Sequence, residues 1–492
     1  MQRLHVRLSL GVAAIVLASS AAVADTPSKQ ALKTNYQLVY NQKPQQAETF
    51  GAMFSNGVFY GRLRSNTFYY QWEDENDKQN NHLISALGGS VVYQSGAYQG
   101  VDFVGGLYFS QAFFNHSDDP VGQLKPGKDV LSRYDYANTS NKSMATAGQA
   151  YIRYSGIAKT EIALGRQLVE TFYTKSNDTK MIPNSFDAVV VSTKAIADTA
   201  ITLGYLAEQK LRDHTQSHGV LVFGDANSSS HAQSQWSEND DSAMHKGLTY
   251  SRLSAAGVDP DAPLITGDIK NSSIPNLNLD ASFYAVPDLV SEVMLEANYK
   301  IAFGGFSVTP GVRYIKQFDD GAGEIGGASY SGKLAGKSGE SGGYKEADSL
   351  ESQMIAARIV GGYGAYKLNL GYSQVMDEAD LITPWRGFPT AGYTRSMARY
   401  NWMANTKSYR IELTRGGNKT GIYKDLFVQL SMLHTDADEN KGYFDENYYY
   451  AGLVQNLPVF VDMQWRLRLG YNDTKKEDAD ALDARFEINY LF

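Results

Sequence analysis

The last nine residues, Ala484-Arg485-Phe486-Glu487-Ile488-Asn489-Tyr490-Leu491-Phe492, alternate between two kinds of side chain. Small or apolar side chains stand at the even positions, and three polar ones, Arg485, Glu487 and Asn489, stand between them. A period of two predicts a β-strand, because successive side chains of a strand point to opposite faces. We therefore expect one face of this strand in apolar surroundings and the other in water.

The chain ends on an aromatic residue, Phe492, with a second aromatic residue, Tyr490, two positions earlier. This ending resembles the terminal strand of bacterial outer-membrane β-barrels. In such a barrel the apolar face of each strand contacts lipid and the polar face lines a wet lumen. Residues 459–472 repeat the alternation, with Trp465 and Leu467 on one face and Arg466 on the other.

The amino terminus has the pattern of a secretory signal peptide. Arg3 and Arg7 precede an apolar stretch at residues 8–17, and Ala22-Val23-Ala24 supplies small residues for cleavage. The apolar stretch is shorter than the roughly 18 residues of a membrane-spanning helix. We predict that residues 1–24 are a signal peptide and that residues 25–492 form a single domain.

Composition excludes several classes of protein. The chain has no cysteine, which excludes disulfides, thiolate metal sites, thiol catalysis and a lipoprotein anchor. Without residues 1–24, 43 basic residues face 53 acidic ones, a net charge of −10 that argues against nucleic-acid binding. The 33 tyrosines and 45 glycines are typical of many strands, tight turns and interfacial aromatic girdles.

Alternating segments of about ten residues recur along the chain. Seventeen such segments are identified by alternation. A bacterial barrel is expected to have an even number of strands, and the alternation of long and short connectors requires an eighteenth strand at 264–271. The prediction is all-β: a transmembrane antiparallel β-barrel of about 18 strands with long extracellular connectors at 115–144, 169–184, 319–349, 377–398 and 435–444. The other predicted strands are 56–73, 82–95, 101–114, 145–156, 158–168, 185–196, 199–211, 276–286, 290–303, 306–318, 350–363, 365–376, 399–415, 421–434, 445–457, 459–472 and 480–492.

Two segments carry a more specific resemblance. The first is AETFGAMFSNGVFYGRLR at residues 47–64; the second is GRQL at 165–168 followed by KSNDTKMIPNSF at 175–186. Both resemble the OprD family of outer-membrane porins. The resemblance implies an 18-stranded barrel whose third extracellular loop folds inward to narrow the pore. It also implies a row of basic residues that guides carboxylate-bearing solutes.

By this resemblance the third loop is residues 169–184, and the residues at its constriction are Asn177, Asp178, Lys180, Met181 and Pro183. From the residues alone the same segment is also compatible with a surface turn, since Asn-Asp-Thr and Ile-Pro-Asn are common turn sequences.

Basic residues on the strands can be placed by alternation. Nine arginines project opposite apolar neighbours, and an arginine in lipid would cost about 2–4 kcal/mol at the membrane midplane, so we expect them to face the lumen. They either guide solutes or pair with acids such as Glu296, Glu412, Asp462 and Glu487. The nine are Arg62, Arg64, Arg153, Arg313, Arg358, Arg410, Arg466, Arg468 and Arg485.

Signals for catalysis or metal binding are weak. His214 and His218 have the i, i+4 spacing of a helical metal pair, but no helix is expected there and no glutamate stands between them. We predict a solvated loop pair, with no catalytic residue, metal or cofactor. The acidic run 436–439 is likewise expected to be solvated.

The predicted function is a porin of a Gram-negative outer membrane, through which ions and small hydrophilic solutes diffuse passively. A basic wall would favour carboxylate-bearing nutrients by raising their local concentration. The expected partners are membrane lipid, lipopolysaccharide and small solutes, and the barrel is expected as a monomer or homotrimer. Two alternatives remain: a structural or adhesive surface barrel that acts through its long loops, and an outer-membrane barrel enzyme.

Overall fold

The computed structural model consists mainly of long strands, with a few short helical turns. The predicted signal peptide, residues 1–24, lies outside the described residues. No described helix has the length and apolar character needed to cross a membrane. The described residues are 30–42, 44–75, 81–115, 128–132, 135–136, 139–221, 245–337, 339–383, 385–460 and 462–492.

The strands follow one another along the chain with few helical interruptions. The helical segments are α1 (Phe50–Ser55), η1 (Lys128–Val130), α4 (Tyr250–Ala255), α5 (Ala322–Gly326) and η2 (Glu439–Lys441). The strands are β1 (Gln30–Leu32), β2 (Leu38–Tyr40), β3 (Val58–Trp72), β4 (His82–Gln94), β5 (Val101–Asn115), β6 (Ser143–Tyr154), β7 (Thr160–Gln167), β8 (Ser185–Thr193), β9 (Thr199–Lys210), β10 (Leu264–Asn271), β11 (Leu277–Val286), β12 (Val290–Tyr299), β13 (Ile301–Phe303), β14 (Phe306–Asp319), β15 (Ser352–Tyr363), β16 (Tyr366–Val375), β17 (Lys407–Arg415), β18 (Phe427–Asp436), β19 (Glu446–Asn456), β20 (Met463–Thr474) and β21 (Ala481–Leu491).

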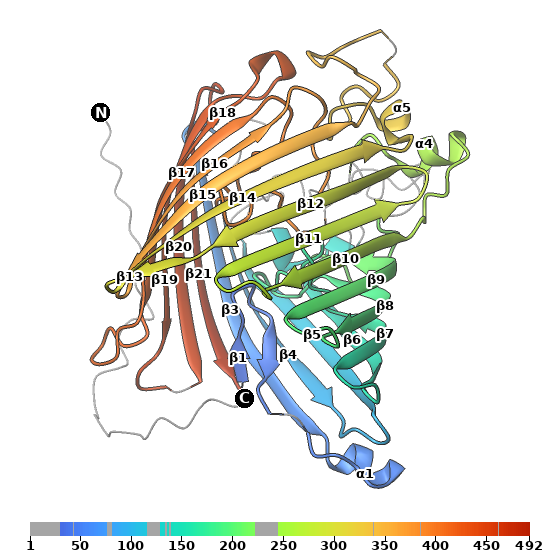
Figure 1. The fold of residues 1–492 in the computed structure, drawn as a ribbon, viewed down its shortest axis with the longest axis vertical. Helices are drawn as coiled ribbons and strands as arrows, with labels where there is room; N and C mark the ends of the chain where they lie inside the picture. Colours follow the sequence, from blue (N-terminus) through green and yellow to red (C-terminus); the bar gives the residue numbers. More distant parts are fainter. Residues whose placement is uncertain are drawn as a thin grey trace.

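Strands β3 to β21 form one closed antiparallel barrel, in which the last strand pairs with β3 (Figure 1). Strands β12 and β13 both pair with β14 and are separated only by Lys300, so they form one interrupted strand. The described barrel therefore has 18 strands, which confirms the prediction. The strand inferred from connector lengths, 264–271, coincides with β10.

Two predicted strands begin six or more residues later than expected. The segments predicted at 399–415 and 421–434 appear as β17 and β18, which start at Lys407 and Phe427. Tyr400 and Trp402 imitate strand alternation, but their rings pack against each other 4.8 Å apart. The Trp402 ring also lies 5.5 Å from the ring of Phe388. Residues 399–406 therefore belong to the connector that precedes β17.

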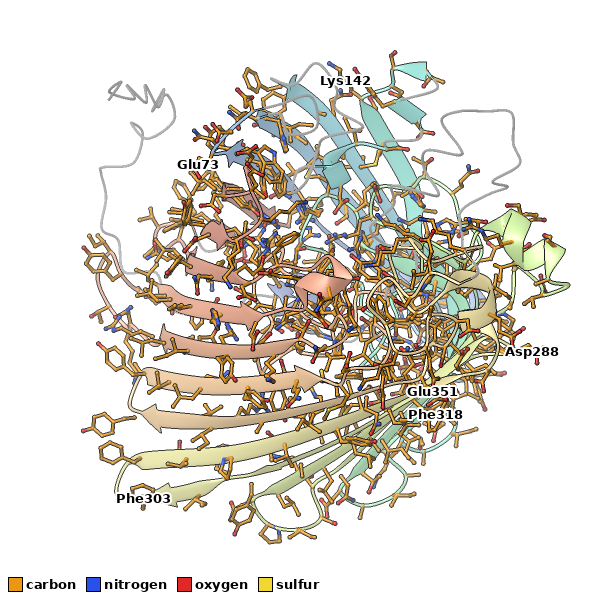
Figure 2. The ribbon with its side chains drawn as sticks, turned by 90° about the horizontal axis from the view of Figure 1, so that it is seen from above. Glu73, Lys142, Asp288, Phe303, Phe318 and Glu351 are labelled. Carbon is orange, nitrogen blue, oxygen red and sulfur yellow. The ribbon has the colours of Figure 1, made fainter. Side chains whose placement is uncertain are left out.

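The two ends of the barrel differ. Most long connectors leave one end, which we call the loop end, and short turns such as Gly304-Gly305 close the other, the turn end. Figure 2 shows Phe303 far from Asp288, Phe318 and Glu351, at the opposite end of the same strands. Because β21 closes on β3, the carboxy terminus lies at the turn end, where Phe492 N donates to Gly61 O at 3.1 Å.

The outer surface of the barrel is apolar. On β3, Leu63 is 50% exposed, whereas its sequence neighbours Arg62 and Arg64 are buried. On β21, Phe486 is 42% exposed, whereas Arg485 and Glu487 are buried. Exposed apolar side chains recur on the outer face of almost every strand, far beyond the patches that soluble proteins expose. Aromatic rings of Phe303, Phe306 and Tyr363 stack at the turn end. This is the exterior of a membrane-spanning β-barrel.

Candidate functional site: the lumen and its crossing loops

A cluster of five arginines lines the inner face where the barrel closes, on β3, β20 and β21. Arg62 and Arg64 of β3 are almost completely buried. In the strand register, Arg468 lies opposite Arg485, and Arg466 lies opposite Glu487. We call this set the arginine cluster; it consists of Arg62, Arg64, Arg466, Arg468 and Arg485.

The connector between β7 and β8, residues 168–184, contains the predicted third loop, residues 169–184, and this loop reaches the cluster. Asp178 Oδ1 accepts a hydrogen bond from Arg64 Nη1 at 2.7 Å, and its other oxygen pairs with Arg62. Asn66 Nδ2 donates to Lys180 O at 2.6 Å. Because β4, β5 and β6 separate β7 from β3, the loop must cross the inner side of the barrel to make these contacts.

The remaining residues predicted at the constriction also lie in this region. Met181 is fully buried, and its sulfur accepts a hydrogen bond from Asn66 Nδ2 at 3.4 Å. Lys210 Nζ of β9 donates to Pro183 O at 3.0 Å. Asn177 has a left-handed backbone, with φ +41°, which asparagine tolerates better than most residues.

Lys180 has unusual surroundings for a lysine. Its Nζ lies 4.1 Å from the centre of the Phe68 ring and 3.9 Å from Asp129 Oδ2. Burial lowers the pKa of Lys180 well below its ordinary value, although the nearby Asp129 carboxylate acts in the opposite direction.

A second connector, residues 376–406, meets the third loop. Lys175 N donates to Trp385 O at 2.9 Å, and Gly387 N donates to Tyr173 O at 3.0 Å. Trp385 is fully buried, and its ring lies 5.0 Å from that of Tyr284 on β11. The two loops thus hold each other between opposite walls of the barrel.

The other predicted arginines lie on inner faces and form ion pairs. Arg153 Nη2 lies 2.9 Å from Asp102 Oδ1, and Arg410 pairs with Glu412. Glu296 accepts hydrogen bonds from two arginines. Arg313 Nε donates to Glu296 Oε2 at 2.7 Å, and Arg358 Nη2 donates to Glu296 Oε1 at 3.2 Å. In the arginine cluster, Glu487 pairs with Arg64 and Arg466, and Asp483 pairs with Arg485.

Arg468 is the exception among the nine. Among the described residues, no carboxylate lies within ion-pair distance of its guanidinium group, and its cross-strand neighbours are Gly452 and Arg485. The arginine cluster has five guanidinium groups and contacts three carboxylates, those of Asp178, Asp483 and Glu487. This wall therefore has an excess of two positive charges.

Sequence reasoning missed part of this arrangement. The inward course of residues 376–406 was not predicted, although the apolar residues Leu381, Ile382, Trp385 and Phe388 in this connector could have indicated it, because such side chains are usually buried. The contacts of Asp178 could not be predicted from spacing, since its arginine partners lie 116 and 114 residues away in sequence.

The prediction of a solvated histidine pair is wrong. His214 is only 2% exposed, and its Nδ1 lies 2.8 Å from Nε2 of His218, so the two rings are joined by a hydrogen bond. The backbone of His218 pairs with Gln209 at the end of β9, which turns this segment inward. Within the described ranges, no group of three or more histidine, cysteine or carboxylate residues is arranged to hold a metal ion.

No protein-family model matches the sequence, and no curated protein matches it. Solved structures do match. OccK8 (OprE) of Pseudomonas aeruginosa has a TM-score of 0.67 at 15% identity, covering 90% of this chain and 99% of that one. OccAB1 of Acinetobacter baumannii has a TM-score of 0.67 at 13% identity, with 92% and 99% covered.

A BenF-like porin from Pseudomonas fluorescens Pf-5 has a TM-score of 0.66 at 12% identity, covering 89% of this chain and 99% of that one. The TM-scores show a shared fold, and at identities this low they show the fold alone. Each match extends over nearly the whole of the solved porin. In its fold, the chain is similar to the solved porins of the OprD family, as the resemblance of residues 47–64 and 165–186 predicts.

Proposed function

We propose that this chain is an outer-membrane porin, through which ions and small hydrophilic solutes diffuse passively. The observation that carries the proposal is a closed barrel with an apolar exterior and a charged, hydrogen-bonded interior. Such an interior is compatible with water-filled passage rather than with a dry core. On this proposal the loop end is extracellular, the turn end is periplasmic, and residues 1–24 are removed on export.

The constriction of the pore, on this proposal, is formed by the third loop and the 376–406 loop. Asp178, Lys180 and Met181 would then lie at its narrowest part. Ion pairs fix the loop against β3, so the constriction is held by buried charge rather than by a flexible surface turn.

A preference for anions would come from the excess charge of the arginine cluster. Eight of the nine arginines are held in ion pairs, so they mainly stiffen the wall, and Arg468 is the one best placed to attract a solute. A related solved porin, OpdK of Pseudomonas aeruginosa, was crystallised with vanillate, a carboxylate; it matches at 12% identity and a TM-score of 0.62.

Liposome swelling tests the passive-pore proposal. Vesicles containing the refolded protein should admit small neutral sugars at rates that fall steeply with sugar size, because the loops limit the aperture. Vesicles with heat-denatured protein are the control. Equal rates for small and large sugars would contradict a constricted pore, and no uptake by the folded protein would contradict the function.

The anion preference needs a separate experiment. Arg468→Gln should shift the reversal potential under a salt gradient away from anion selectivity, because it removes the unpaired positive charge. Arg415→Gln is the matched control, since Arg415 projects from the outer face of β17 and contacts Tyr366. Equal shifts in both variants would contradict a guiding role for Arg468.

A further inference from the structure

The segment before the barrel forms a small hairpin of its own. Strands β1 and β2 pair antiparallel, with Gln30 opposite Tyr40, in a two-stranded sheet separate from the barrel. The connecting turn has Tyr36 at its tip in a left-handed conformation, with φ +65°, and Tyr36 N donates to Lys33 O at 2.7 Å.

The tip of this hairpin lies inside the barrel, against the arginine cluster. Arg62 Nη1 of β3 donates to Tyr36 O at 3.0 Å. The guanidinium carbon of Arg466, on β20, lies 3.5 Å from the centre of the Tyr36 ring. Tyr36 is 6% exposed, so the cluster and the loops around it enclose the ring almost completely.

The hairpin also touches the third loop. Asn35 Nδ2 donates to Ser176 Oγ at 3.4 Å. Further back along the hairpin, Leu38 is buried in the same apolar cluster as Met181, and the Tyr40 ring stacks on Tyr60 of β3 at 5.3 Å. One side of the hairpin thus follows the inner wall, and its tip ends where the third loop meets that wall.

The hairpin enters from the turn end. After β2 the chain passes through Ala47, which bridges to Tyr98 in the turn between β4 and β5, and then through α1 into β3. Figure 1 shows α1 and the carboxy terminus at the same end of the barrel. The hairpin and the third loop therefore approach the arginine cluster from opposite ends.

The attachment of the hairpin is light compared with that of a barrel strand. It shares no strand ladder with β3, and a two-stranded hairpin alone is at best marginally stable in water. Its tip is held by one hydrogen bond from Arg62, one to Ser176 and one cation–π contact. Within the described part of the chain, no strand ladder joins the hairpin to the barrel, so it can leave the lumen without separating a pair of barrel strands.

We propose that the β1–β2 hairpin is an internal gate, which holds the pore in a low-conductance state while Tyr36 occupies the arginine cluster. The proposal rests on the porin function proposed above. Tyr36 presents a carbonyl oxygen and the face of an aromatic ring, both of which attract guanidinium groups. An anionic solute that reaches the cluster competes for the same guanidinium groups and favours withdrawal of the hairpin toward the turn end.

Deleting the hairpin tests whether it blocks the pore. A variant lacking residues 30–42 should still fold, because these residues take no part in barrel closure, and heat-modifiable migration on gels checks this. Its single-channel conductance should exceed that of the intact chain, and brief closures should disappear. Tyr36→Ala should raise the fraction of time spent open, whereas Thr34→Ala, an exposed neighbour in the same turn, should not.

Cross-linking tests whether the gate must move. The chain has no cysteine, so Asn35→Cys and Ser176→Cys introduce the only two thiols. A short bis-methanethiosulfonate reagent should lock the double variant in the low-conductance state, and a reductant should restore opening. Each single-cysteine variant, treated in the same way, controls for the bulk of the reagent.

The outcomes separate the gate from the porin function. Discrete channels of equal conductance with and without residues 30–42, unaffected by cross-linking, would overturn the gate and leave the porin intact. An absence of channels from both folded proteins would overturn the porin function and the gate with it. Larger channels from the deletion variant, together with reversible locking of the double-cysteine variant, would support both.

Discussion

Single carboxylates organise the interior of this barrel. Asp178 stands between Arg62 and Arg64, and Glu487 continues the chain of charges to Arg466. Each group is nearly inaccessible to water, so each depends on the others for the stabilisation that water would otherwise give. Removing one member leaves its partners buried without a counter-charge.

Asp178→Asn should therefore weaken the folded barrel. We expect a loss of about 3–5 kcal/mol in the free energy of unfolding, the range for breaking one side of a buried ion pair. The reversal potential should also move toward anion selectivity, because the cluster gains one net positive charge. Urea titration of the protein in detergent and bilayer recording measure the two effects.

Asp198→Asn is the control for Asp178→Asn, since it removes the same charge from an exposed turn whose left-handed backbone asparagine accepts. It should leave both quantities nearly unchanged. If the two variants behaved alike, the charge network would not hold the third loop.

At the loop end, Asp438 joins two connectors. It accepts hydrogen bonds from Asn405 Nδ2 at 2.8 Å and from Lys441 Nζ at 2.7 Å. Burial alone would raise the pKa of Asp438, but these bonds outweigh it and lower the pKa to about 2. A carboxyl whose pKa is depressed on folding contributes stability above its ordinary pKa of about 3.9, and loses it as the pH falls toward 2.

We predict that the contact between residues 436–445 and the 376–406 loop loosens as the pH falls from about 4 to about 2, the interval between the two pKa values of Asp438. Hydrogen exchange followed by mass spectrometry should detect lower protection there, relative to the intrinsic exchange rate of an unstructured peptide at the same pH. In the Asp438→Asn variant this contact should be loose at every pH, and its protection should no longer depend on pH. A wild-type contact that stays protected at pH 2 would contradict the assignment.

At the scale of elements, glycine lets a loop lie directly on the barrel wall. Gly371 of β16 faces inward, and a Cβ built on it would lie 2.3 Å from Tyr393 O of the 376–406 loop. Backbone atoms cannot move aside as easily as the end of a side chain. Strand and loop can approach this closely only because position 371 has no side chain.

Gly371→Ala should push the 376–406 loop away from β16. We expect a loss of about 1–3 kcal/mol in stability, as for an overpacked core, and a larger single-channel conductance. Gly361→Ala, in the adjacent strand β15, is the matched control, because its Cβ would meet nothing nearer than 3.9 Å. A conductance that is unchanged in Gly371→Ala would mean that this loop does not limit the pore.

Strands were more predictable from sequence than loops, for a physical reason. Alternation at residues such as Arg466, Leu467 and Arg468 is imposed by lipid on one side and water on the other, and both are known without the structure. The β1–β2 hairpin and the 376–406 loop pack mainly against other parts of the barrel interior. Their positions depend on partners distant in sequence, as Tyr36 depends on Arg466, so no local pattern reveals them.

At the scale of the whole molecule, the barrel reverses the arrangement of a soluble protein, with apolar side chains outside and ion pairs inside. The interior is crossed by the third loop, the 376–406 loop and the hairpin, which meet near the arginine cluster. Closure between β3 and β21 makes the wall continuous and leaves no strand edge exposed to lipid. Any solute that crosses must therefore pass the loops.

Single-channel recording of refolded residues 25–492 in a planar bilayer tests this account most directly. We predict discrete, ohmic current steps. A small carboxylate should reduce the size of the open-state step, because it competes with chloride at the arginine cluster, and should raise the fraction of time spent open, because it favours withdrawal of the hairpin. A folded protein that inserts into the bilayer but gives no steps would contradict the account.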